Sequence, residues 1–174
     1  NGRPVFEMVN AANEAFDDRG DVIKLNVVFN PVRDYAKVRG DFIDYDNDGD
    51  VDIYFLNGAP LLGTKVDTAP TNALYRNDGA WKFTDVTDRA GIGDPGYGLG
   101  MAIGDYDNDG NRDIYVNNFG PNVLYRNNGD GTFSDVTEAG GVTNGDLMGA
   151  GASFLDIDRD GDLDVVVGHS RARC

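Results

Sequence analysis

The chain has 174 residues, enough for a domain with a sizeable hydrophobic core. Its formal net charge of −15 argues against nucleic acid and anionic membrane surfaces as partners, because both attract basic proteins. No apolar run reaches the roughly 18 residues of a membrane span. The single cysteine, Cys174, excludes an internal disulfide. The excess of acid instead indicates a cation as the natural partner.

Residues 1–33 differ in pattern from the rest and form a first predicted domain, with residues 34–174 as the second. Apolar residues at helical spacing from Val5 to Phe16 predict a short amphipathic helix. Alternation of apolar and polar residues then predicts a strand over residues 21–30, which Pro31 stops. Two interpretations stay open. The segment caps the first repeat, or its strand completes a sheet elsewhere, including one in a neighbouring molecule.

The acidic pattern D-x-D-x-D-G-x-x-D then appears three times, beginning at Asp44, Asp105 and Asp156. Calcium prefers six to eight oxygen ligands, and positions 1, 3 and 5 of a tightly curled loop direct side chains at one centre. The glycine at position 6 supplies a positive φ. Position 7 offers its backbone carbonyl, position 9 closes the shell, and position 4 is expected to point away. A solvated Asp/Gly turn is the alternative for one copy, but three copies favour metal.

The pattern therefore predicts three Ca²⁺ sites with oxygen ligands only. Their predicted residues are Asp44, Asp46, Asp48, Asp50 and Asp52 in the first loop, Asp105, Asp107, Asp109, Asn111 and Asp113 in the second, and Asp156, Asp158, Asp160, Asp162 and Asp164 in the third. An EF-hand loop needs an acidic residue at position 12. In these loops position 12 is apolar, namely Phe55, Val116 or Val167, so they are not EF-hands. A β-rich apolar run follows each loop instead of a helix.

The repeat extends beyond the acidic loop. Residues 72–77 (N-A-L-Y-R-N) recur as residues 122–127, and residues 83–87 (F-T-D-V-T) recur as residues 133–137. Each repeat is thus predicted as two hairpins: strand, metal loop, strand, and then two strands joined by an Asn-Gly or Asp-Gly turn. Four short strands at this period are typical of propeller blades. The glycine-rich run from Gly98 to Gly104 predicts an inner strand where another chain segment approaches closely.

The string G-D-Y-D-N-D-G-x-x-D-I-Y-V-x-N, followed by N-x-L-Y-R-N-N-G-D-G-T-F-x-D-V-T, resembles the FG-GAP/VCBS repeat family, which includes integrin-α-like propellers and ASPIC/UnbV-type proteins. The resemblance covers about residues 36–169. It implies an all-β fold of calcium-stabilised propeller-type blades, usually in secreted or surface proteins with adhesive or recognition roles. We expect two and a half to three four-stranded blades, with a short N-terminal helix and strand.

The remaining candidates for chemistry are weak. His169 is the only histidine, and Ser170 beside it has no third partner that the sequence identifies. Trp81 lies in a predicted turn, where it either contacts a partner or sugar or packs locally. Tyr75-Arg76 and Tyr125-Arg126 either link blades or pack within strands. We therefore expect a protein that is not an enzyme.

The expected function is a non-catalytic, calcium-stabilised structural or adhesive module outside the cell or on its surface. Its open blade edges favour self-assembly with other copies of the chain into a fibre or larger assembly. A glycan is an alternative ligand. Two other functions stay open: part of a closed propeller that recognises a ligand, or the scaffold of a secreted carbohydrate-active enzyme.

Overall fold

The computed structural model describes residues 39–57, 70–80, 82–145 and 147–170, together with residues 6–7, 15–16, 22–23 and 26–27 near the N-terminus. Contacts within the chain define two compact units, Asn1–Tyr35 and Ala36–Cys174. Each unit is described by itself below. No helix among the described residues is both long enough and apolar enough to cross a membrane.

In the first unit the described residues form two small antiparallel pairs. Strand β1 (Phe6–Glu7) pairs with β4 (Asn26–Val27), and β2 (Ala15–Phe16) pairs with β3 (Val22–Ile23). The helix predicted from Val5 to Phe16 is therefore wrong at its described positions. An isolated helix of that length is marginal in water, whereas pairing satisfies backbone groups directly. The predicted strand over residues 21–30 is also divided, and both of its described parts have partners within this unit.

The second unit begins with a four-stranded antiparallel sheet in the order β5-β6-β7-β8. Its strands are β5 (Arg39–Ile43), β6 (Asp52–Leu56), β7 (Ala73–Asn77) and β8 (Phe83–Asp85). The same arrangement recurs in β9 (Tyr97–Gly104), β10 (Asp113–Phe119), β11 (Val123–Asn127) and β12 (Phe133–Asp135). A third hairpin follows, made of β13 (Met148–Leu155) and β14 (Asp164–Ser170).

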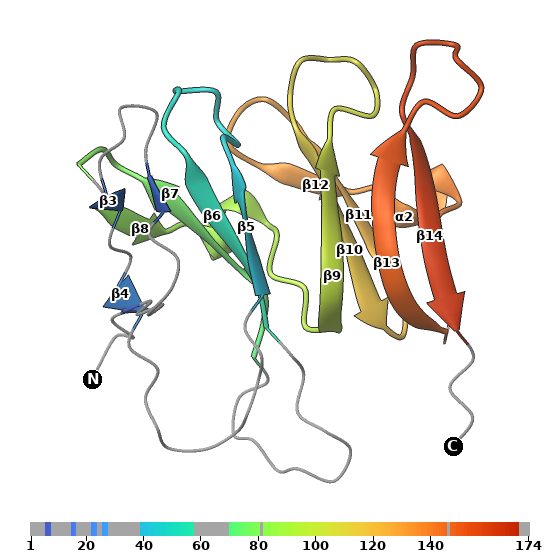
Figure 1. The fold of residues 1–174 in the computed structure, drawn as a ribbon, viewed down its shortest axis with the longest axis horizontal. Helices are drawn as coiled ribbons and strands as arrows, with labels where there is room; N and C mark the ends of the chain where they lie inside the picture. Colours follow the sequence, from blue (N-terminus) through green and yellow to red (C-terminus); the bar gives the residue numbers. More distant parts are fainter. Residues whose placement is uncertain are drawn as a thin grey trace, which may run out of the picture. The chain divides into compact units, whose positions relative to one another are not determined.

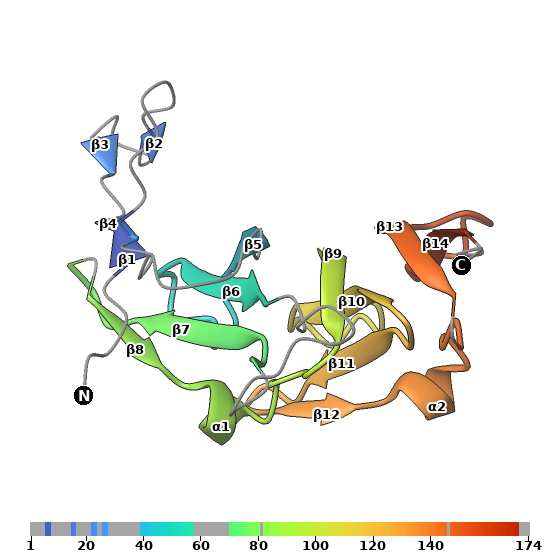
Figure 2. The same ribbon diagram turned by 90° about the horizontal axis from the view of Figure 1, so that it is seen from below.

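These sheets match the predicted blades, and Figure 1 shows them side by side. In Figure 2, β5, β9 and β13 lie along one side of the unit and β8 and β12 along the other. The third hairpin joins the second blade through one bridge, Phe119 to Met148. The fold is therefore all-β, with two complete four-stranded blades and the first half of a third. Trp81 and Cys174 lie outside the described residues.

The core lies between neighbouring blades. One cluster of buried residues draws on both complete blades, and its fully enclosed members include Tyr45, Tyr54 and Val116. A second cluster, around Tyr115 and Leu124, packs against partly buried residues of the third hairpin such as Phe154. Each blade thus buries one face against the next, as layered β architectures require.

Two single-turn helices, α1 (Thr87–Ala90) and α2 (Thr137–Gly140), were not predicted. Each begins at the threonine of the D-V-T sequence at the end of a blade's last strand. In the first, the Asp85 carboxylate accepts hydrogen bonds from the Thr87 backbone N–H and hydroxyl, and the Leu74 N–H donates to the same hydroxyl. Gly91 then ends the helix with a φ of 70°. The Asp-x-Thr spacing was the local signal for this turn.

The glycine-rich strand β9 has the close approaches that its sequence predicted. A Cβ added at Gly98 would lie 3.0 Å from the Leu56 Cβ, and one at Gly104 would lie 3.0 Å from the Phe154 ring. The equivalent strand β13 is tighter still, because a Cβ at Gly149 would lie 1.7 Å from the Asn117 side-chain oxygen. The small residues therefore let the inner strands β9 and β13 pack closely against neighbouring blades.

Candidate metal centres

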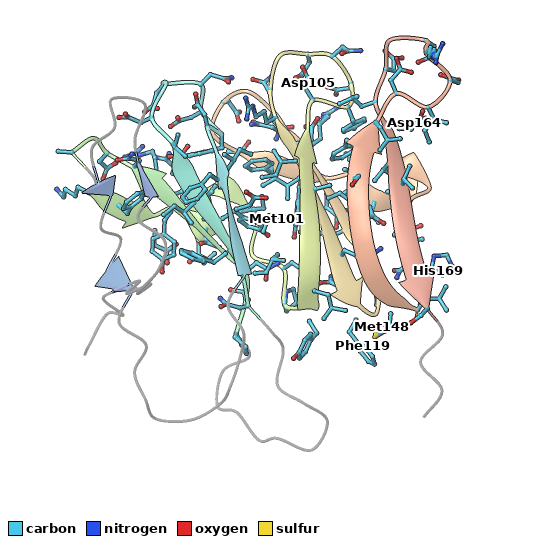
Figure 3. The ribbon with its side chains drawn as sticks, in the orientation of Figure 1. Met101, Asp105, Phe119, Met148, Asp164 and His169 are labelled. Atoms are coloured by element: carbon cyan, nitrogen blue, oxygen red, sulfur yellow. The ribbon has the colours of Figure 1, made fainter. Side chains whose placement is uncertain are left out.

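The three acidic loops connect the first two strands of each blade: β5 to β6, β9 to β10, and β13 to β14. All three lie at the same end of the blades in Figure 1. Figure 3 marks this end by Asp105 and Asp164, whereas Phe119, Met148 and His169 lie at the opposite end. The repeat therefore places three acidic groups in a row along one rim of the unit.

Each loop brings three carboxylates together, with one oxygen from each lying within 4.8 Å of the others. The groups are Asp44, Asp46 and Asp48; Asp105, Asp107 and Asp113; and Asp156, Asp158 and Asp164. The other predicted residues are outside these groups in the structure: Asp50, Asp52, Asp109, Asn111, Asp160 and Asp162. Like charges at this separation repel unless a cation lies between them.

The backbone curls as the sequence predicted. Gly49, Gly110 and Gly161 at position 6 have φ values of 88°, 91° and 100°. Their N–H groups donate to the carboxylate at position 1 of the same loop over 3.0–3.2 Å. Position 4 also has a positive φ, of 57° at Asn47 and 56° at Asn108. Asparagine tolerates this conformation better than most residues, and that preference was the available signal.

The last aspartate of the first two loops is buried and tied to the second hairpin of its blade. Asp52 accepts hydrogen bonds from the Tyr45 N–H at 3.1 Å and the Asn77 N–H at 2.8 Å. Asp113 likewise accepts from the Tyr106 N–H at 3.0 Å and the Asn127 N–H at 2.8 Å. Burial raises the pKa of both carboxyl groups to about 6. Position 9 was expected only to close a metal shell, so this structural role was missed.

The first loop also contains buried oxygens without a partner. Oδ1 of Asp44 and Oδ1 of Asp46 are enclosed and accept no hydrogen bond. Burial, followed by the nearby Asp48 charge, raises the pKa of Asp46. Orphaned carboxylate oxygens are costly, and a cation would satisfy them. Because the converging atoms are all carboxylate oxygens, the chemistry fits a hard ion such as calcium.

The other sequence candidates that lie within the described residues do not assemble into a second site. His169 and Ser170 are exposed in β14, within the strand and not beyond it as predicted. Arg76 pairs with Asp78 at 2.6 Å, and Tyr125 is buried in the core between blades. The Tyr75 ring meets the Phe55 ring edge-on, at a centroid distance of 5.8 Å. Tyr75 and Tyr125 therefore contribute packing, and Arg76 a local ion pair.

Four-stranded antiparallel blades with an acidic loop between their first two strands define the chain as a propeller-type repeat protein. The family model for the FG-GAP-like repeat matches residues 44–116 and 105–167, which is most of the chain. The chain belongs to this FG-GAP-like repeat family. No curated protein matches it closely enough to count as a relative.

Proposed function

We propose that the chain is a non-catalytic module that binds calcium through its three acidic loops and serves adhesion or recognition outside the cell. The observation that carries this proposal is the convergence of three carboxylates in every loop, with two enclosed and unpartnered oxygens in the first. Calcium sites of extracellular modules bind in the 10⁻⁴–10⁻³ M range, and the proposal places these loops in that range. His169, the single histidine, is exposed and lies at the end of the blades opposite the acidic loops, so it does not combine with their carboxylates.

Calorimetric titration should find three calcium ions per chain, and an anomalous-scattering map should place one ion in each loop. Asp46→Asn should remove one ion, because it neutralises a converging carboxylate of the first loop while preserving its shape. Asp88→Asn is the matched control, since Asp88 is an exposed acid on α1 outside every loop. Magnesium should not replace calcium, because it demands bonds of about 2.0–2.1 Å and retains water. Absence of bound metal in wild type would overturn the proposal.

A second candidate function is self-assembly through the edge of β14. Among the described strands β14 pairs only with β13, whereas the equivalent β6 and β10 each have a further partner. Val166 is 42 % exposed at the position where Tyr54 and Tyr115 are fully buried. The edge carries no charge from Val165 to Ser170, so nothing along it opposes pairing with another strand. We propose that its partner is β14 of a second copy.

Light scattering over a range of protein concentrations tests this assembly. Wild type should form dimers, and Val166→Lys should weaken dimerisation about tenfold or more, because it places a charge on the pairing strand. Val51→Lys is the matched control, since Val51 is 43 % exposed but lies in the first acidic loop. A wild-type chain that stays monomeric with calcium bound would exclude the second candidate and leave the calcium module intact.

A further inference from the structure

The three acidic loops are connected to one another by side-chain hydrogen bonds. The Asn47 Nδ2 group donates to the Asn111 Oδ1 atom at 2.9 Å, which joins the first loop to the second. The Asn108 Nδ2 group donates to the Asp162 Oδ1 atom at 2.7 Å and to the Gly161 carbonyl at 3.1 Å, which joins the second loop to the third. In both cases position 4 of one loop reaches position 7 of the next. The position 4 side chain was predicted to point away from the metal of its own loop, and in the first two loops it points toward position 7 of the next loop.

The acceptor residues in turn hold the carboxylate at position 5 of their own loop. The Asn111 backbone N–H and its Nδ2 group both donate to the Asp109 carboxylate, at 2.8 and 2.9 Å. The Asp162 N–H donates to the Asp160 carboxylate at 3.0 Å. Asn47 therefore acts on Asp109 through Asn111, and Asn108 acts on Asp160 through Asp162. Asn108 also fixes the Gly161 carbonyl, next to the position 7 carbonyl that was predicted as a ligand.

The backbone conformation of Asn47 and Asn108 fixes the direction in which their side chains extend toward the next loop. Asn47 and Asn108 both adopt a positive φ, near 57° and 56°. The backbone around Asn108 is held by Asp105, which accepts from the Asp109 N–H at 3.0 Å and the Gly110 N–H at 3.0 Å. Anything that fixes the Asp105 carboxylate thereby fixes the turn that carries Asn108. A second loop with a fixed backbone therefore holds Asn108 in place to donate to Asp162 and the Gly161 carbonyl in the third loop.

Among the described residues, a second connection joins the first two loops and has no counterpart at the third. The Asn127 Nδ2 group donates to the Tyr45 carbonyl at 2.7 Å, while the Asn127 N–H donates to Asp113. Asn127 therefore bridges the backbone of the first loop and a converging carboxylate of the second. Between the second and third loops the described hydrogen bonds are those of Asn108. The second and third loops are therefore the simpler pair in which to test whether calcium binding in one loop affects the other.

We propose that Asn47 and Asn108 are positioning residues that couple neighbouring loops, so that calcium bound in one loop raises the affinity of the next. The inference rests on the calcium binding proposed above. An ion that orders one loop also orders its position 4 asparagine, and the next loop then loses less conformational entropy when it binds. Coupling of this kind is reciprocal, so the third loop strengthens the second to the same degree.

The test follows each loop separately through the amide signals of Gly49, Gly110 and Gly161 in a calcium titration by nuclear magnetic resonance. Each of these N–H groups donates to a position 1 carboxylate, so its chemical shift reports the ion in its own loop. Asp158→Asn disables the third loop. In that variant the Gly110 midpoint should move to a calcium concentration at least about fivefold higher, the lower bound of typical allosteric coupling.

Asn108→Gly should remove this dependence, because glycine keeps the positive φ and loses the donor. In the Asn108→Gly background, adding Asp158→Asn should change the Gly110 midpoint by less than about twofold, below the roughly fivefold lower bound of typical coupling. Arg159→Gly is the matched control. Arg159 is the position 4 residue of the third loop, with a φ of 66°, and within the described part of the chain its side chain forms no hydrogen bond to another loop. It should leave the Gly110 midpoint unchanged.

The outcomes separate this inference from the proposed function. If all three glycine signals shift with calcium but Asp158→Asn leaves the Gly110 midpoint unchanged, the loops bind calcium independently and the coupling is wrong. If the dependence on Asp158 persists in Asn108→Gly, the loops are coupled by another route and the role of Asn108 is wrong. If no glycine signal shifts in wild type, calcium binding and the coupling fail together.

Discussion

Removing calcium with a chelator is expected to lower the melting temperature of the blade unit by roughly 20 °C at neutral pH. In a buffer that holds calcium at a hundredfold excess over its dissociation constant, about 10–100 mM for sites of the proposed affinity, an ion that binds only the folded state contributes about 2.7 kcal/mol. Three such sites contribute on the order of 8 kcal/mol, comparable with the whole stability of a typical domain. For a chain of this size each kcal/mol corresponds to about 2–4 °C. Melting followed by circular dichroism, with and without chelator, measures the change.

Two controls separate ion binding from simple charge screening. Sodium chloride at high concentration relieves repulsion among exposed carboxylates but supplies no directed ligand bonds, so it should restore only a small part of the loss. Magnesium at the same concentration as calcium should also restore little. The Asp44 and Asp46 oxygens that accept no hydrogen bond need a directed ligand bond, which a diffuse atmosphere of screening ions does not supply. A melting curve unaffected by chelator would refute a structural role for calcium.

The sequence predicted the blades well because their signals are local and repeated. The apolar run Ile53-Tyr54-Phe55, the turn at Asn77-Asp78-Gly79 and the glycines of β9 each have a short-range physical cause. A register error would expose a whole apolar face, so few arrangements compete. The same reasoning failed near the N-terminus, where apolar spacing between Val5 and Phe16 favoured a helix but the described residues pair as strands.

The sequence predicted which carboxylates converge in each metal loop only in part, and it did not predict the hydrogen bonds between loops. The carboxylates at positions 1 and 3 converge as expected in every loop. The third group member varies: it is Asp48 at position 5 in the first loop, and Asp113 or Asp164 at position 9 in the other two. The link from Asn108 to Asp162 joins residues 54 positions apart. No pattern within one repeat reveals a bond whose two ends lie in different repeats.

Asp113→Ala is expected to destabilise the blade unit by about 2–4 kcal/mol even in the presence of a chelator. The change leaves the Tyr106 and Asn127 N–H groups without their carboxylate acceptor inside the blade. Each orphaned buried donor costs about 1–3 kcal/mol. Burial raises the pKa of Asp113 to about 6, so the carboxylate is largely ionised at pH 7 and its removal relieves a desolvation penalty. That relief offsets only part of the loss, because two donors depend on one group.

Asp164→Ala supplies the matched control, since Asp164 holds the same position in the third loop but is exposed. Its carboxylate accepts one described hydrogen bond, from the Ile157 N–H at 3.0 Å. In chelator this variant should lose only about 0.5 kcal/mol, as exposed substitutions usually do. Urea denaturation of both variants, with and without calcium, separates the two roles of position 9. Calcium should widen the gap between wild type and either variant, because each loses a converging carboxylate. Equal losses for both variants in chelator would show that the hydrogen bonds to Asn127 and Tyr106 do not hold the second hairpin to the loop.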